Sequence, residues 1–494
     1  MSSSPAPESA LKPTLGVFDV VAITVSAVTP ASSVFVIAPF AIQQAGTGAF
    51  WAFALAGVLA LMFAWCYAEL GRAHSTAGGE YVYAKRVFGG LAGYATFLTV
   101  LAMLLFIPPV LATGAATYLN AALGTHFDAQ TVALAIVAFS YLLGILNIRV
   151  NAWVTGTCLL LEVAALLVIV GLGFGHAQQP ASVLLQPQVV GDGGLLAIAP
   201  WALVIGAVGT ALFSYNGFGG AVLLAEDMKD GGHSVHRAVL WSLALVVLIE
   251  IVPLAALLIG APSLPAMLAS PDPIGYLLNS HGNETLSRLV SAGIFLSVFN
   301  AIVAIVIQSA RVIFSSGRDA LWMPALNRAF TRIHPRWESP WLATLFLAIP
   351  SAALSFSSNL AELTSFTVLL IVMVYLIVAL CALFSRVLRR DREHPYRMPL
   401  WPLPALLAVS GAGYLLLNLF LAASARDVMI IVGLLAVSVI LYCTYGKLSP
   451  AFQKLWKQES ACALDNLASP SAWALPARST RSPTFPACAS ATAP

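Results

Sequence analysis

The stretch Ser26–Val36, SAVTPASSVFV, lies in the middle of the first hydrophobic segment of the chain. Its flanks, over about 17–44, are typical of a membrane-spanning helix. Inside it, Pro30 lacks a backbone N–H, and its ring clashes with the carbonyl four residues earlier. Hydrocarbon cannot satisfy the carbonyls freed in this way. The stretch therefore predicts a broken helix whose break faces protein or a water-filled cavity.

A second interruption is predicted at Phe213–Ala221, FSYNGFGGA, inside the sixth hydrophobic segment. Its glycines allow unusual backbone angles and a close approach of other groups. Two interrupted helices in corresponding positions, five segments apart, indicate a substrate site at the interface of two inverted repeats. The pair predicts a secondary transporter.

The composition predicts an all-α polytopic membrane protein. Of the 494 residues, 59% are hydrophobic and only 9% are charged, whereas a soluble domain carries about 25% charged residues. A membrane-spanning helix needs about 20 apolar residues. On that measure we expect twelve transmembrane helices, at about 17–44, 48–71, 91–120, 129–147, 151–175, 197–225, 238–260, 286–315, 341–357, 362–385, 402–424 and 428–446.

The distribution of positive charge predicts the orientation in the membrane. Connections rich in Lys and Arg alternate along the chain with connections that contain neither, around 121–128, 176–196, 261–285 and 358–361. By the positive-inside rule we expect both termini in the cytoplasm and a multi-pass protein of the cell (inner) membrane. The expected domains are a cytoplasmic N-terminus (1–14), a transporter domain (15–446) and a disordered cytoplasmic tail (447–494).

Four cytoplasmic segments resemble those of amino acid permeases in the amino acid–polyamine–organocation (APC) superfamily. They are AELGRAHSTAGGEYVYAKRVFG (Ala68–Gly89), LLAEDMKDGGHSVHRAV (Leu223–Val239), FSSGRDALWMPALNRAFTRIHPRWESPWLATL (Phe314–Leu345) and HPYRMPLWPLPAL (His394–Leu406). All four occur in the family's order and after the corresponding spans, so together they are highly specific.

The resemblance covers about residues 14–446 and implies a five-plus-five inverted repeat with broken helices 1 and 6. The first repeat is expected at about 15–175 and the second at about 197–385, followed by two extra helices at about 402–446. It also implies that small organic substrates are transported by alternating access.

The first break departs from the family at one place. Many members that bind α-amino acids carry a Gly-Ser-Gly type of run there, whose bare amides hold the substrate carboxylate. Here the run is Thr29-Pro30-Ala31-Ser32-Ser33. Its amides and hydroxyls can still bind an anion at the start of the second half-helix, but Pro30 removes one donor. The class of substrate is therefore left open by this departure.

The candidate substrate-binding residues lie in the two breaks. Around the second break, hydroxyl and amide groups stand beside glycines, and two phenylalanines are suited either to an aromatic gate or to cation–π contact with an ammonium. Close packing of helices at small residues is the alternative role. The candidates are Ser26, Ala27, Thr29, Ser32 and Ser33 in the first break, and Phe213, Ser214, Tyr215, Asn216 and Phe218 in the second.

Two carboxyl groups lie deep within predicted spans, Glu162 in span five and Glu250 in span seven. Ionisable groups inside a membrane are costly and indicate function by default. The resemblance matches Glu162 to a position where some proton-coupled relatives carry a lysine. We expect Glu162 to load and release a proton; the alternatives are a hydrogen bond to a broken-helix carbonyl or contact with a cationic substrate. Glu250 is the second proton candidate, unless it bonds backbone freed by Pro253.

These observations predict a proton-coupled amino acid symporter. A polyamine or organic amine carrier, or an amino acid exchanger, on the same scaffold is the alternative. The expected partners are a small amino acid or amine, protons and the lipid bilayer, with no nucleic acid. No P-loop, nucleophile–base pair or metal cluster is visible in the sequence, so we expect no enzyme activity, no metal and no cofactor. A nutrient sensor is disfavoured because no sizeable cytoplasmic domain is predicted, and a channel because polarity is confined to the breaks.

Overall fold

The computed structural model describes residues 15–74, 78–146, 148–191, 194–230, 232–282, 284–337, 339–357, 360–388, 396–448 and 452. The predicted N-terminal segment (1–14) and residues 453–494 of the predicted tail lie outside the described residues.

The first half of the chain is almost entirely helical. Its helices are α1 (Val17–Val28), α2 (Pro30–Ser32), the π-helix η1 (Ser33–Ile37), α3 (Ala38–Ala45), the 3-10 turn η2 (Gly46–Gly48), α4 (Ala49–Ala73), α5 (Glu80–Phe88), α6 (Gly90–Leu123), α7 (Ala129–Gly144) and α8 (Ile148–Gly175). A 3-10 turn, η3 (Ala181–Leu184), precedes two short strands, β1 (Gln188–Val190) and β2 (Leu196–Ile198).

The second half continues in the same way. It contains α9 (Trp201–Ser214), the 3-10 helix η5 (Phe218–Asp227), α10 (Val235–Ile259), α11 (Leu264–Ala269), α12 (Pro273–His281), α13 (Glu284–Arg318), α14 (Pro324–Phe330), α15 (Trp341–Phe346), α16 (Ala348–Ser357), α17 (Leu360–Val387), α18 (Leu403–Ala422) and α19 (Ala425–Leu448).

Eight helical segments of the described chain are long and apolar enough to cross a membrane. One of them, Val17–Ala73, runs through both of the first two predicted spans. Shorter apolar helices lie at Ala129–Gly144, Leu160–Gly175 and Trp341–Phe356, where three more spans are predicted. The chain is thus a mostly helical, multi-pass membrane protein, while twelve spans and an inverted repeat remain predictions.

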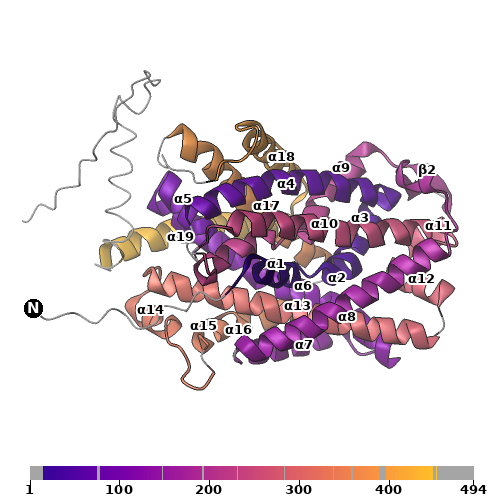
Figure 1. Cartoon of the computed structure of the whole chain (residues 1–494), viewed down its shortest axis with the longest axis horizontal. Helices are drawn as coiled ribbons and strands as arrows, with labels where there is room; N and C mark the ends of the chain where they lie inside the picture. Colours follow the sequence, from indigo (N-terminus) through magenta and orange to yellow (C-terminus); the bar gives the residue numbers. More distant parts are fainter. Residues whose placement is uncertain are drawn as a thin grey trace, which may run out of the picture.

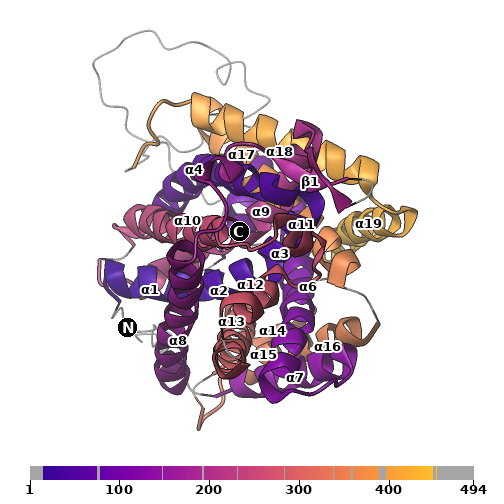
Figure 2. The same cartoon turned by 90° about the vertical axis from the view of Figure 1, so that its right-hand side faces the viewer.

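The long helices run side by side in one bundle (Figure 1). Helix α6 packs against α13 and α17, α4 against α9 and α10, and α8 against α10 and α13. The apolar helices α18 and α19 lie at the periphery (Figure 2) and have only 22% and 11% of their most apolar stretch buried in the protein. Their exposed apolar faces suit contact with lipid, whereas α2, η1 and α3, which follow the first break, lie within the bundle.

The two short strands are an exception to the all-α expectation. They pair antiparallel, with Gln188 opposite Ile198, where the end of a connection (about 176–196) and the start of span six (about 197–225) are predicted. The Gln188 N–H donates to the Thr47 hydroxyl at 2.8 Å, which ties the hairpin to the turn that follows α3. The hairpin therefore covers the end of the first interrupted helix.

Candidate functional site

The first predicted interruption is present at the junction of α1 and α2. Helix α1 ends at Val28, and Thr29 takes a left-handed conformation with φ 54° and ψ 74°. Pro30 then occupies the first position of α2, where its missing N–H disrupts no helical hydrogen bond. The chain continues through the π-helix η1 before α3 begins. Thr29 thus leaves the right-handed helical region, which the ring of the following proline disfavours.

The second predicted interruption is also present. Helix α9 ends at Ser214, and the turn that follows contains Gly217 with φ 120°, a conformation that L side chains rarely adopt. A Cβ atom added to Gly217 would lie 3.0 Å from a side-chain atom of Val28. The glycine thus lets the second break touch the end of α1.

Side chains satisfy carbonyls that the two breaks expose. The Ser33 hydroxyl donates to the Ser214 carbonyl at 2.8 Å and joins one break to the other. The Tyr118 hydroxyl of α6 donates to the Phe35 carbonyl, in the π-helix, at 2.6 Å. Hydrocarbon would leave such groups unpaired, so these bonds are what permits the irregular backbone inside the bundle.

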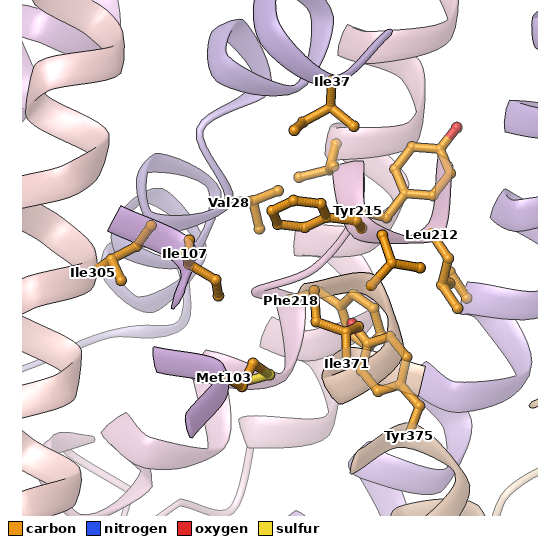
Figure 3. Packing of buried hydrophobic residues seen from close by; sticks show 14 of the residues in the cluster. Val28, Ile37, Met103, Ile107, Leu212, Tyr215, Phe218, Ile305, Ile371 and Tyr375 are labelled. Atoms are coloured by element: carbon orange, nitrogen blue, oxygen red, sulfur yellow. The ribbon is translucent and has the colours of Figure 1, made fainter. Parts of the chain in front are cut away.

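A cavity lies where the two breaks meet. It has an empty volume of 810 Å³, which includes the part open to solvent. Apolar side chains of α1, α6 and α13 form much of its wall, and Figure 3 shows Val28, Met103, Ile107 and Ile305 around this region.

Six of the ten predicted substrate-binding residues line this cavity: Ala27, Thr29, Ser32, Ser33, Phe213 and Asn216. The Ser32 hydroxyl is buried and has no hydrogen-bond partner among the described residues. It is therefore a polar group available to a ligand.

The other four candidates are not among the lining residues. Ser26 and Ser214 are buried, and their hydroxyls have no partner within the described chain. The Tyr215 hydroxyl donates instead to the Phe53 carbonyl at 3.1 Å. Phe218 stacks on Tyr375, with ring centroids 5.8 Å apart, as Figure 3 shows. Phe218 thus supports the wall from behind rather than facing the cavity beside Phe213.

Glu162 of α8 is fully buried and reaches the first break. Its Oε1 atom accepts the Ala31 N–H at 2.6 Å, and its Oε2 atom has no hydrogen-bond partner among the described residues. Ala31 lies in the first turn of α2, where free N–H groups favour an anion. One predicted alternative is a protonated Glu162 that donates a hydrogen bond to a broken-helix carbonyl. In the structure the direction is the opposite, because the Ala31 amide donates to the Glu162 carboxyl.

Glu250 of α10 is also fully buried, and neither of its oxygens has a hydrogen-bond partner within the described chain. Glu162 and the Ser33 side chain lie near enough to interact with it electrostatically, although the Ser33 hydroxyl makes its hydrogen bond to Ser214. The bond to backbone freed by Pro253 that the sequence suggested for Glu250 is not made.

The sequence did not identify several polar groups that line the cavity, chiefly Tyr67, Glu80, Gln308 and Tyr375. The Tyr67 hydroxyl donates to Glu80 Oε1 at 3.0 Å, and the Tyr375 hydroxyl donates to Asn216 Oδ1, also at 3.0 Å. Glu80 is the first residue of α5, in a segment predicted to be a cytoplasmic loop, and burial raises the pKa of its carboxyl. The glycines before Glu80 were the only local signal of a close approach.

Comparison with known proteins identifies relatives over nearly the whole chain. The family model "Amino acid permease" matches residues 15–443. The branched-chain amino acid permease BcaP of Bacillus subtilis is 22% identical, over 83% of this chain and 89% of its own. The methylthioribose transporter of the same bacterium is 21% identical, over 82% and 88%. Its serine/threonine exchanger SteT is 22% identical, over 74% and 82%.

Proposed function

Because this chain belongs to the amino acid permease family, whose members are transporters and not enzymes, we propose that it moves amino acids across the cell membrane by alternating access, in symport with protons. The observation that carries the proposal is the meeting of two helix breaks at one cavity, with the buried Glu162 carboxyl bonded to the Ala31 amide at the first break.

Substrate recognition in this proposal uses the two breaks. Ser32 offers an unpaired buried hydroxyl, and Asn216 offers an amide, on the same cavity. Aliphatic side chains of α6 and α13 accommodate the apolar part of an amino acid. A cavity with few convergent polar groups in an apolar wall suits a small organic molecule. The proposed site also includes four further lining residues, Ala27, Thr29, Ser33 and Phe213, and the buried Ser26 beside them.

Proton coupling in this proposal uses Glu162, with Glu250 as its neighbour. An ionised carboxylate accepts the Ala31 N–H strongly, because such charge-assisted hydrogen bonds are about twice as strong as neutral ones. Protonation of Glu162 weakens that bond and loosens α8 from the start of α2. The protonation state of Glu162 thus biases the position of the first break, which is where substrate binds.

The proposed topology has twelve spans with both termini in the cytoplasm of an inner-membrane protein, and two five-helix repeats of opposite orientation. The alternation of Lys- and Arg-rich connections with connections lacking both supports the orientation. The breaks at α1–α2 and at α9–η5 support the repeats, since each falls in the first helix of its proposed half.

Exchange is the second candidate function. The relative SteT is named an exchanger. The same cavity would serve exchange if the protein changed conformation only when substrate is bound, because each substrate that enters must then be matched by one that leaves. An organic amine carrier is a further form of the same proposal, because Glu80 adds a carboxyl to the cavity.

Uptake by the purified protein in proteoliposomes tests the proposal. Labelled neutral, acidic and basic amino acids and putrescine are offered with and without an inward proton gradient. We expect an amino acid to accumulate when the gradient is present and only to equilibrate without it. Uptake confined to vesicles preloaded with amino acid would support exchange, and uptake of putrescine alone would replace the amino acid proposal by the amine carrier.

A further inference from the structure

We propose that Glu80, held by Tyr67, binds a positively charged group of the substrate, so that the carrier prefers ligands with a cationic side chain or a second amine. This inference rests on the proposed function and adds the class of substrate. It concerns a residue outside the two breaks, on the helix that follows α4.

The geometry directs Glu80 toward the cavity. Both Tyr67 of α4 and Glu80 of α5 are among the lining residues, and the phenol donates to Glu80 Oε1 at 3.0 Å. Tyr67 is itself fixed by edge-on contacts with the rings of Phe218 and Tyr375, at centroid distances of 5.7 and 6.1 Å. The carboxyl is therefore held in one position at the wall of the cavity.

The charge of Glu80 is left without a protein counter-charge. No Lys or Arg of the described residues forms an ion pair with it, and the Tyr67 hydroxyl supplies its one hydrogen bond from another side chain there. A carboxylate has about four acceptor positions, so most of its capacity remains for a ligand. Burial penalises the ionised form and raises the pKa of Glu80. A bound cation would offset that penalty.

The rest of the cavity suits a ligand with charges at two ends. Ser32 contributes from the first break an unpaired hydroxyl that can donate to a carboxylate, in the same cavity that Glu80 lines. Three aromatic side chains, Tyr67, Phe213 and Tyr375, also line it, and aromatic faces attract cations. A basic amino acid has a carboxylate to accept from Ser32, and a distal ammonium or guanidinium to contact Glu80 and the aromatic rings.

A purely structural role for Glu80 is the simpler alternative. An acidic residue in the first turn of a helix stabilises that helix through its dipole, and Glu80 opens α5. That role needs neither a phenol partner nor a position on the cavity wall. It also predicts equal effects of substitution on all substrates, which separates it from the proposed role.

The test is equilibrium binding of labelled lysine, leucine and putrescine to the purified full-length protein. The variants are Glu80→Gln, Glu80→Asp, which keeps the charge, and the control Glu284→Gln, which removes an exposed carboxyl paired with Arg288. We expect Glu80→Gln to weaken lysine binding by about tenfold or more, the scale of a lost hydrogen bond to a charged group. Leucine binding should change less than threefold. Glu80→Asp should retain the preference for lysine, and Glu284→Gln should match the unmodified protein.

Three results would overturn the inference. Equal losses for lysine and leucine in Glu80→Gln would assign Glu80 to helix stability or closure, and no loss for either would remove it from recognition. Binding of leucine without lysine by the unmodified protein would also overturn it, while leaving amino acid transport intact. Glu80-dependent binding of putrescine with no amino acid bound would support the inference and overturn the amino acid proposal instead.

Discussion

Replacing Glu162 by Gln removes the ionisable group at the first break while keeping its size. The Gln side-chain oxygen can still accept the Ala31 N–H, which the carboxyl accepts at 2.6 Å. The variant loses the difference between a charge-assisted and a neutral hydrogen bond, about 1 kcal/mol. That is a small loss for folding, so we expect Glu162→Gln to insert in the membrane and to bind substrate.

The effect on coupling should be much larger than the effect on binding. One pH unit corresponds to about 1.4 kcal/mol per proton, so a carrier that moves one proton with each substrate concentrates it about tenfold across a gradient of one unit. Two fully buried carboxyls are near one another here, Glu162 and Glu250. If both moved a proton in each cycle, the accumulation would be about a hundredfold.

The assay is accumulation in proteoliposomes at a fixed gradient, followed by counterflow into preloaded vesicles without a gradient. We expect the unmodified protein to reach about a tenfold ratio of internal to external substrate. Glu162→Gln should equilibrate without accumulation and yet perform counterflow. Accumulation equal to that of the unmodified protein would refute the coupling role of Glu162. A hundredfold ratio in the unmodified protein would indicate a second proton in each cycle, for which Glu250 is the candidate.

Three further predictions follow from other contacts. Glu69 is fully buried and accepts hydrogen bonds from Arg386 and from a backbone N–H; Glu69→Ala should destabilise the protein by about 3 kcal/mol, measured as an earlier thermal unfolding transition. Gly217→Ala should cost about 1–3 kcal/mol because of its φ of 120° and should impair uptake, whereas the control Gly206→Ala meets nothing within 4 Å and should not. Burial raises the pKa of Glu80, so lysine binding should strengthen as the pH rises through this raised pKa and the carboxyl ionises, and weaken at lower pH. In binding assays at several pH values, Glu80→Gln should abolish this dependence.

Much of the fold followed from local sequence. A proline among serines and a threonine, and a glycine-rich run, predict helix breaks inside apolar segments, and α1 ends beside Pro30 while α9 ends before Gly217. Proline alone is not sufficient, since α6 continues through Pro108 and Pro109. The short hairpin was missed because its two strands have three residues each, too few for an alternating pattern to emerge. Its first strand is tied to the turn after α3 by the bond from the Gln188 N–H to Thr47, a contact that local sequence does not reveal.

The site was predicted only in part because side-chain direction depends on tertiary packing. Serines and aromatics in the breaks were identified by type, but the sequence does not say that Tyr215 turns toward Phe53 or that Phe218 packs behind Tyr375. Glu80 lies in a segment predicted to be a cytoplasmic loop and far in sequence from both breaks, so the sequence does not place it at the cavity. Only the return of α5 against α6 and α17 brings it to the cavity.

The hydrogen bond from Ser33 to the Ser214 carbonyl and the contact of Gly217 with α1 connect the two breaks directly. Separating the two breaks would cost the Ser33–Ser214 hydrogen bond, about 1 kcal/mol, so we expect the two half-helices to move together. A ligand that contacts one break is therefore expected to affect the position of both breaks. We therefore expect a state in which one break has moved and the other has not to be disfavoured.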